Sequence, residues 1–251
     1  MTAPDFRLDG AAALVTGGRR GLGRAIAAAL AASGARVAIS HEGTADAAEA
    51  AATLRAIGGV AALPADLRLP EAPATLIAAA VAALGGLRIL VCNAAAERRE
   101  ALSEITPEGM DLMWQVNVRA TLDLVRAAIP HLEGGGRVLL LGSVQAMRPN
   151  PHQLAYAASK AALANMGRNL ARQLAPRGIA VNILSPGAIA TEGNTAALAE
   201  PAYRAMVEAR IPAGRLGMPS DVAGAAVFLC SPAAAYLAGA EIVVDGGLSA
   251  G

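Results

Sequence analysis

The sequence predicts an α/β protein built on a doubly wound parallel sheet. Short runs rich in Val, Ile and Leu alternate with longer Ala-rich amphipathic segments along the whole chain. The composition is 55% hydrophobic but only 2% aromatic, which favours small side chains packed where helices lie flat on a sheet. Because strands that alternate with helices form parallel sheets covered on both faces, we expect a single Rossmann-type domain with a seven-stranded parallel sheet flanked by helices on both faces.

The elements follow one another in regular order. Strands are expected at residues 12–16, 36–40, 60–64, 89–93, 137–142, 180–184 and 241–245. Helices are expected at residues 21–33, 45–57, 72–84, 107–131, 154–176 and 219–229. Glycines mark the boundaries, with Gly34 and Gly58 after helices and Gly178 before the sixth strand. Each strand except the last is therefore expected to lead into a helix that crosses back over the sheet.

The chain is expected to form one domain over residues 1–251. No linker rich in Ser, Gly or Pro divides it. The one long stretch without strand character runs from about 186 to 217, after the sixth strand. An insertion at the carboxyl end of a strand covers the ligand crevice in open α/β sheets, so we expect this segment to cover the substrate.

Charge and composition exclude several classes of partner. Lys and Arg number 21 against 20 Asp and Glu, a net charge of +1, and no segment concentrates either sign, so no nucleic acid or membrane partner is expected. The longest apolar stretch, near Leu76, is broken by Gly85 and Gly86, and the N-terminus has no secretory signal pattern. Cys92 and Cys230 lack C-x-x-C spacing. We expect a cytoplasmic protein with reduced thiols and no metal site.

The first strand is followed by a glycine-rich turn that opens the first helix. The run Thr16–Gly23 reads T-G-x-x-x-G-x-G, which differs from the commonest dinucleotide fingerprint, G-x-G-x-x-G. Gly17 permits a tight turn, while Gly21 and Gly23 let a phosphate approach the backbone at the positive end of the helix dipole. The position of the turn between strand and helix predicts a nucleotide-phosphate site.

Tyr156 and Lys160 lie four residues apart in an expected helix, so their side chains share one face. A phenol titrates near pH ~10, and a nearby cation favours its ionised form. Tyr156 is then suited to donate a proton in reduction and to accept one in oxidation. Taken alone, this spacing is common in helices; together with the glycine turn it indicates a dehydrogenase.

With these motifs in place, the chain resembles the short-chain dehydrogenase/reductase family over essentially its whole length. The resemblance implies a catalytic tetrad of Asn117, Ser143, Tyr156 and Lys160. Ser143, after the fifth strand, would polarise the substrate carbonyl. Asn117, in the fourth helix, would hold a water that relays protons from Lys160. It also implies a homotetramer whose interfaces are formed by the last strand and the helices at 107–131 and 154–176.

The resemblance further implies the groups that bind the nicotinamide dinucleotide. Asp66 and Leu67 match the pair that contacts the adenine, and the segment after the sixth strand matches the nicotinamide-binding segment. The usual N-N-A-G after the fourth strand departs here at two of its four positions, which leaves Asn93 and Ala94 to line the cofactor. The expected cofactor-binding residues are Gly17, Arg19, Arg20, Gly21, Leu22, Gly23, Ser40, His41, Asp66, Leu67, Asn93, Ala94, Tyr156, Lys160, Pro186, Gly187, Ile189 and Thr191.

The end of the second strand decides between the two nicotinamide cofactors. NAD binders usually carry an acidic residue there, and NADP binders use Arg or Lys for the extra phosphate. His41 stands where NAD-preferring members usually have Asp, and Arg20 could reach a phosphate. Glu42 argues against NADP, because its negative charge repels the extra phosphate. The balance favours NADP(H) over NAD(H).

Polar residues around the expected crevice favour a small polar substrate. Arg98, Gln145, Arg148 and His152 are the expected substrate contacts. The runs at 98–100, 194–198 and 210–215 resemble the branch acting on sugar acids such as gluconate and 2-keto-3-deoxygluconate, and a guanidinium suits a carboxylate. Reduction of a 3-oxoacyl thioester is an alternative, because that branch shares most motifs. A nucleotide-binding protein without turnover is an alternative of another class, disfavoured by the complete tetrad.

Overall fold

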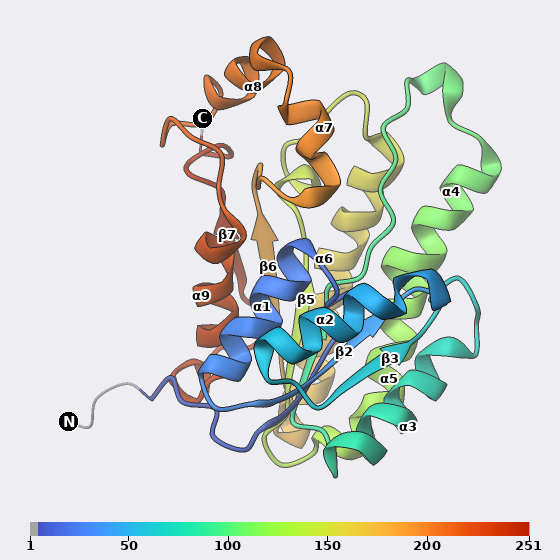
Figure 1. The fold of residues 1–251 in the computed structure, drawn as a ribbon, viewed down its shortest axis with the longest axis vertical. Helices are drawn as coiled ribbons and strands as arrows, with labels where there is room; N and C mark the ends of the chain where they lie inside the picture. The colour runs from blue at the N-terminus through green and yellow to red at the C-terminus, as the bar shows by residue number, and fades with distance from the viewer. Residues whose placement is uncertain (1–4, 251) are drawn as a thin grey trace.

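The computed structural model describes residues 5–250, without the side chains of 196 and 197, which belong to the run 194–198. A seven-stranded sheet with the order β3-β2-β1-β4-β5-β6-β7 runs through its centre, and every neighbouring pair of strands is parallel. The strands are β1 Ala12–Val15, β2 Arg36–His41, β3 Ala61–Pro64, β4 Ile89–Cys92, β5 Arg137–Leu141, β6 Ala180–Pro186 and β7 Glu241–Val244. Figure 1 shows the sheet between its two layers of helices. The predicted fold class is confirmed.

Six long helices cover the sheet. They are α1 Gly21–Ala32, α2 Ala47–Ile57, α3 Ala72–Leu84, α5 Ala120–Leu132, α6 Leu154–Leu174 and α9 Pro219–Cys230. One apolar cluster buries side chains of α1 and α9 against one face, such as Ile26 and Val222. A second buries α3, α5 and α6 against the other, through Leu76, Leu124 and Leu163. Both faces of the sheet are thereby removed from water, as its nearly continuous apolar strands require.

The predicted helix over residues 107–131 is interrupted. α4 (Pro107–Trp114) and α5 are joined by a π turn at Gln115–Arg119. In a π turn the backbone hydrogen bonds join residues five apart instead of four. The apolar pattern continues through the turn, so periodicity alone does not reveal it. π turns inside helices recur at functional sites, and this one contains Asn117.

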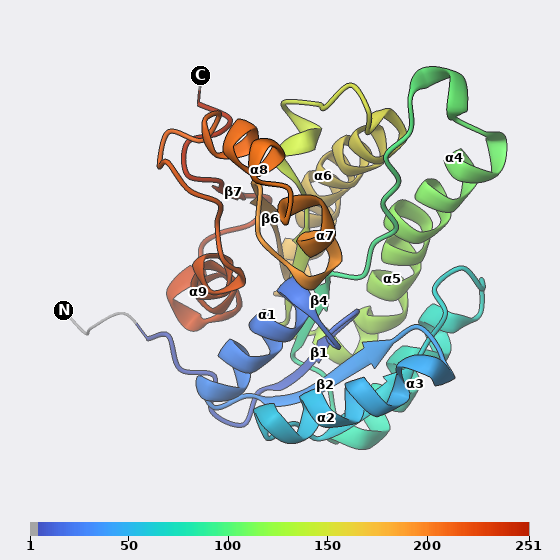
Figure 2. The same cartoon turned by 45° about the horizontal axis from the view of Figure 1, so that its top comes forward.

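Residues 186–217 contain two helices that the sequence pattern did not show. α7 (Thr195–Leu198) and α8 (Pro201–Glu208) follow β6. In Figure 2 they lie over the end of the sheet at which α1 begins. Because all strands are parallel, this is also the edge at which β1, β4, β5 and β6 deliver the predicted site residues.

No helix within residues 5–250 is long and apolar enough to cross a membrane. Over the same range no group of His, Cys, Asp and Glu side chains could hold a metal ion.

Candidate active site

The turn after β1 is fixed by the end of β4. The Asn93 side chain donates to the carbonyls of Thr16 and Gly17 at 2.9 and 3.2 Å, and the Thr16 hydroxyl accepts from the backbone N–H of Asn93. Gly17 has φ +62°, and a Cβ at Gly23 would stand 2.3 Å from the Gly17 carbonyl oxygen. Only glycine fits at these two positions. The hydrogen bonds that hold the turn come from Asn93, so they are present although the run after β4 departs from N-N-A-G.

A cradle for an anion follows from this geometry. Without Cβ atoms at Gly17 and Gly21, the backbone of the turn is open to a close approach, and the first turn of α1 has no acidic side chain of its own. The residues present therefore fit a dinucleotide diphosphate, whose charge suits the positive end of the α1 dipole.

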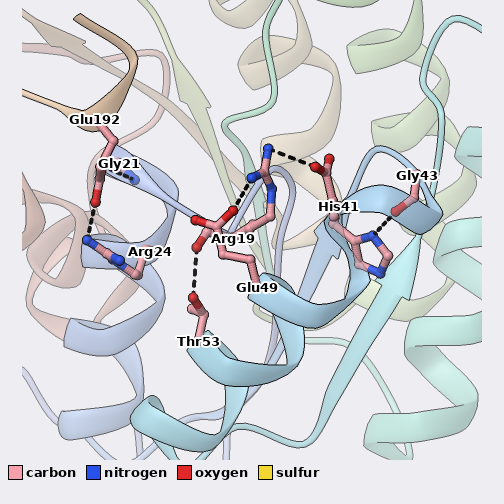
Figure 3. Close-up of polar contacts among 9 residues, drawn as sticks. Arg19, Gly21, Arg24, His41, Gly43, Glu49, Thr53 and Glu192 are labelled. Carbon is pink, nitrogen blue, oxygen red and sulfur yellow. Dashed lines mark hydrogen bonds and ion pairs between the residues drawn. The ribbon is translucent and has the colours of Figure 1, made fainter. Parts of the chain in front are cut away.

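A carboxylate from the insertion lies against the first residue of α1. Glu192 accepts a hydrogen bond from the backbone N–H of Gly21 at 3.0 Å and pairs with Arg24, as Figure 3 shows. A hydrogen bond from its own backbone N–H holds the pKa of Glu192 below its ordinary value against the effect of burial, with help from the Arg24 charge, the Gly21 N–H and the Arg20 charge. This contact clasps the insertion to the glycine turn.

A cavity of about 460 Å³ extends from the glycine turn along the ends of β2 and β3. Nine predicted cofactor residues line it: Gly17, Arg19, Arg20, Ser40, His41, Asp66, Leu67, Asn93 and Ala94. His41 is buried, and its Nδ1 contacts the Gly43 carbonyl at 2.9 Å. The location and the lining of this cavity, called the adenosine cavity below, fit the adenosine half of a dinucleotide.

The arginines of this half are mostly engaged. Arg19 pairs with Asp46 and Glu49 across the start of α2, and Figure 3 shows this pairing. Arg68 pairs with Asp66 and with Glu42, 3.1 Å away. Arg20 is exposed and has no ion-pair partner within residues 5–250. Arg20 is thus the guanidinium free to meet an added phosphate.

Ser143, Tyr156 and Lys160 meet at the ends of β5 and α6. Lys160 is buried, and its Nζ donates to the Leu141 carbonyl at 2.6 Å while lying 5.6 Å from the centre of the Tyr156 ring. The Ser143 hydroxyl accepts from the backbone N–H of Gln145 at 3.1 Å, which leaves its own proton free to donate. Tyr156 and Ser143 line one cavity with Leu22, Pro186, Gly187, Ile189 and Thr191.

Burial controls the protonation of this group. It lowers the pKa of Lys160 to about 8, with Glu97 and Cys92 acting in the opposite direction. It raises the pKa of Tyr156 above its ordinary value; the Glu97 charge raises it further, and a hydrogen bond with Ser143 lowers it. The spacing of Tyr156 and Lys160 predicts that the neighbouring cation lowers the pKa of the phenol. In this structure desolvation outweighs that effect.

Asn117 connects the loop after β4 to α6. Its amide donates to the Ala96 carbonyl and to the Ser159 hydroxyl, both at 2.9 Å, and its Oδ1 accepts from the Ala96 N–H at 2.8 Å. Ser159 lies between Tyr156 and Lys160 on α6 and donates to the Tyr156 carbonyl. The direct contacts of the Asn117 side chain therefore position the catalytic helix and the loop.

The predicted substrate residues divide between two cavities. Gln145, Arg148 and His152 line a cavity of about 560 Å³ that is continuous with the one at Tyr156. Arg98 instead lines the adenosine cavity and pairs with Glu100 at 3.3 Å. Arg99, and not Arg98, lines the cavity with Gln145, Arg148 and His152. Successive residues of an extended loop face opposite sides, so the two arginines point into different cavities.

Glu97, which belongs to the polar loop expected beside the crevice, is not among the predicted catalytic, cofactor or substrate residues, yet it lies in the site. It lines both the adenosine cavity and the cavity at Tyr156, and it accepts a hydrogen bond from the buried Gln153 side chain. Its charge acts on Tyr156 and Lys160. No motif marks this position; the signal was a carboxylate four residues after Asn93, beside a crevice.

Comparison with known proteins places this geometry in a family. A family model described as enoyl-(acyl carrier protein) reductase matches residues 17–249. The L-rhamnose-1-dehydrogenase of Scheffersomyces stipitis is 34% identical, with 96% of each chain covered. A 3-oxoacyl (acyl-carrier-protein) reductase of Agrobacterium tumefaciens C58, solved with NADP bound, is 36% identical with a TM-score of 0.90, over 98% of this chain and 97% of that one.

A structure of a putative 2-deoxy-D-gluconate 3-dehydrogenase from Agrobacterium tumefaciens, with bound NADP, is 36% identical with a TM-score of 0.89, and each chain is covered completely. The agreement in fold extends to the strands that carry the glycine turn and the serine. This chain belongs to the short-chain dehydrogenase/reductase family and is an oxidoreductase of that family.

Proposed function

We propose that the protein transfers a hydride between NADP(H) and a secondary alcohol or carbonyl of a small polar substrate, such as a sugar acid or polyol. One observation carries the proposal: Ser143 and Tyr156 share a cavity with the segment after β6, and that cavity borders a second one whose lining includes three arginines. The L-rhamnose and 2-deoxy-D-gluconate dehydrogenases among the similar proteins support the substrate class.

When bound, the dinucleotide supplies or accepts the hydride. In reduction, the Ser143 hydroxyl keeps its proton and donates a hydrogen bond to the substrate carbonyl oxygen, which polarises the carbonyl carbon. Tyr156, which burial keeps protonated, delivers the proton that becomes the new hydroxyl hydrogen. In oxidation, Tyr156 accepts that proton back.

Lys160 and Asn117 support this transfer. Lys160 is anchored on Leu141 and is positively charged below about pH 8, so it stabilises negative charge on the phenol oxygen as the proton leaves. Asn117 fixes the turn of α6 that carries both groups through Ser159. The four residues thus act as one proton-handling unit.

Preference for NADP rests on the charges around the adenosine cavity. Arg20 is free, and Arg68 pairs with Glu42, which weakens the repulsion between Glu42 and a phosphate at the end of β2. The similar structures with bound NADP support the same preference. A carboxylate suited to the ribose hydroxyls of NAD is absent at position 41, which is His.

Reduction of a 3-oxoacyl thioester is the second candidate. Val144, Met206 and Val207 give the outer cavity one apolar side, which suits an acyl chain. The similar 3-oxoacyl (acyl-carrier-protein) reductase supports it. Both candidates use the same proton chemistry. They differ only in the part of the substrate that fills the cavity lined by Gln145, Arg148 and His152.

The assembly we propose is a homotetramer in the cytoplasm. Large apolar side chains are exposed on the elements expected at its interfaces: Trp114 on α4, Leu154 on α6 and Val243 on β7. Burying such surface between subunits offsets its contact with water. Light scattering after size exclusion measures the mass, and a monomer would contradict the proposal.

The function is tested by following the absorbance of the reduced nicotinamide with both cofactors. The panel contains sugar acids, polyols and 3-oxoacyl thioesters. We expect turnover with sugar acids or polyols and a higher kcat/KM with NADP. Turnover confined to 3-oxoacyl thioesters would select the second candidate.

A further inference from the structure

The cavity that opens from Tyr156 ends at three arginines. Arg99 follows β4, Arg148 follows β5, and Arg210 follows α8. The cavities at Tyr156 and at the arginines share lining residues, among them Gln145, Gln153 and Tyr203. A molecule whose reacting carbon lies beside Tyr156 can therefore extend toward this arginine cluster.

Uncharged acceptors orient two of the three guanidinium groups, and one of these, Arg99, also forms a long ion pair with Glu97. Arg99 donates to the Tyr203 hydroxyl at 2.6 Å, and Arg148 donates to the Leu248 carbonyl at 2.5 Å. Arg210 has no ion-pair partner among the described residues. Uncharged acceptors fix where a guanidinium points but leave its positive charge available to an anion.

The carboxylates nearby have other partners. Glu100 pairs with Arg98, and Glu104 accepts from the backbone N–H of Ala101 at 2.7 Å. Glu97, 3.9 Å from the Arg99 Nε, is hydrogen-bonded by Gln153. The far end of the cavity therefore carries a net positive charge, and Arg148 and Arg210 contribute most of it.

We propose that Arg99, Arg148 and Arg210 bind a substrate carboxylate at the end remote from the reacting carbon. This inference rests on the proposed function for the location of that carbon and adds the substrate class, a hydroxy or oxo acid. A guanidinium binds both oxygens of a carboxylate in one plane. A neutral polyol or the neutral arm of a thioester leaves these charges unpaired, so the cluster selects acids over both.

The test replaces Arg210 or Arg148 by Met, which keeps the apolar stem and removes the charge. Arg204→Met is the matched control, because Arg204 lies on α8, close in sequence to Arg210, but pairs with Glu208 at 2.9 Å outside the cavity. Six-carbon aldonates are compared with their amides and with the corresponding alditols. We expect R210M and R148M to lower kcat/KM for the acids by roughly tenfold or more, mainly through KM.

The same variants should leave kcat/KM for the amides and alditols within about twofold of wild type, as should R204M for every substrate. Equal kcat/KM for an acid and its amide in the wild type, or equal losses in R204M and R210M, would overturn the proposal. A sugar phosphate preferred over every acid would also overturn it, since the cluster would then serve a phosphate.

Calorimetric titration of aldonates into the NADP-loaded protein supplies a readout that does not need turnover. We expect binding by the wild type and at least tenfold weaker binding by R210M. If nothing in the panel is turned over while this difference persists, the proposed function fails and the arginine site stands. Equal binding of aldonates by the wild type and R210M would contradict the arginine site and would leave the proposed function untouched.

Discussion

The two ends of the cleft use arginine in opposite ways. At the adenosine end, Arg19 and Arg68 are each held between two carboxylates. At the substrate end, Arg99 and Arg148 donate to a hydroxyl and a carbonyl, and Arg148 has no carboxylate partner among the described residues. Ion pairs at the surface contribute little stability but fix where a loop lies. Anion binding therefore falls to backbone N–H groups and Arg20 at one end and to a cluster of guanidinium groups at the other.

Tyr156 lies where the two ends meet, and its removal is expected to have the largest effect. Tyr156→Phe keeps the ring and deletes the proton donor, so kcat should fall by roughly 10²–10⁴-fold. NADPH affinity, measured by fluorescence titration, should stay within a few-fold of wild type, because the adenosine end is untouched. Retention of more than about a tenth of the activity would show that another group handles the proton.

The adenosine end is probed by His41→Asp. The new carboxylate would accept ribose hydroxyls of NAD and repel the added phosphate of NADP, so the NADP/NAD ratio of kcat/KM should fall by about tenfold. Glu49→Gln is a control that alters the same surface through Arg19 without facing the end of β2. An unchanged NADP/NAD ratio of kcat/KM would mean that the residue at position 41 does not contact the adenosine ribose or its phosphate.

The clasp between Glu192 and the start of α1 is expected to control access to the glycine turn. Glu192→Gln removes the charge that Arg24 and the Gly21 N–H hold. Association and dissociation of NADPH should both become several-fold faster in stopped-flow fluorescence, because the insertion opens more often. Glu200→Gln, in the same insertion but at the start of α8, is the control. Unaltered rates in E192Q would contradict a clasp.

Glu97 should shift the pH profile by less than about one unit, the smallest effect of the series. Its charge raises the pKa values of both Tyr156 and Lys160. Glu97→Gln removes that charge, both pKa values fall, and the limb on which reduction is lost should move to lower pH. Glu100→Gln should leave the profile in place. Movement of the limb to higher pH would show that the sign assigned to Glu97 is wrong.

Much of the fold could be predicted because strands and turns leave strong local signals. The expected strand at 89–93 and β4 (Ile89–Cys92) differ by a single residue, and Gly58 ends α2 in the left-handed conformation. The π turn at Gln115–Arg119 escaped because its hydrogen-bond shift does not change the apolar pattern. α7 and α8 were not predicted because they have only four and eight residues, too few for a helical pattern to stand out from a loop.

The site could be predicted where a motif fixes both residue type and backbone. The glycine turn and the Tyr156 and Lys160 pair are of this kind. Glu97 and the direction of Arg98 depend on how one loop folds over the cleft, which spacing does not encode. The pKa of Tyr156 likewise depends on burial, a property of the packed protein.

A crystal structure with NADP bound tests the division of the cleft most directly. The account predicts the added phosphate beside Arg20 and the nicotinamide ring against Ser143 and Tyr156, with electron density bridging the two cavities over the glycine turn. A nicotinamide ring in the arginine-lined cavity, or a phenol turned away from the ring, would contradict it.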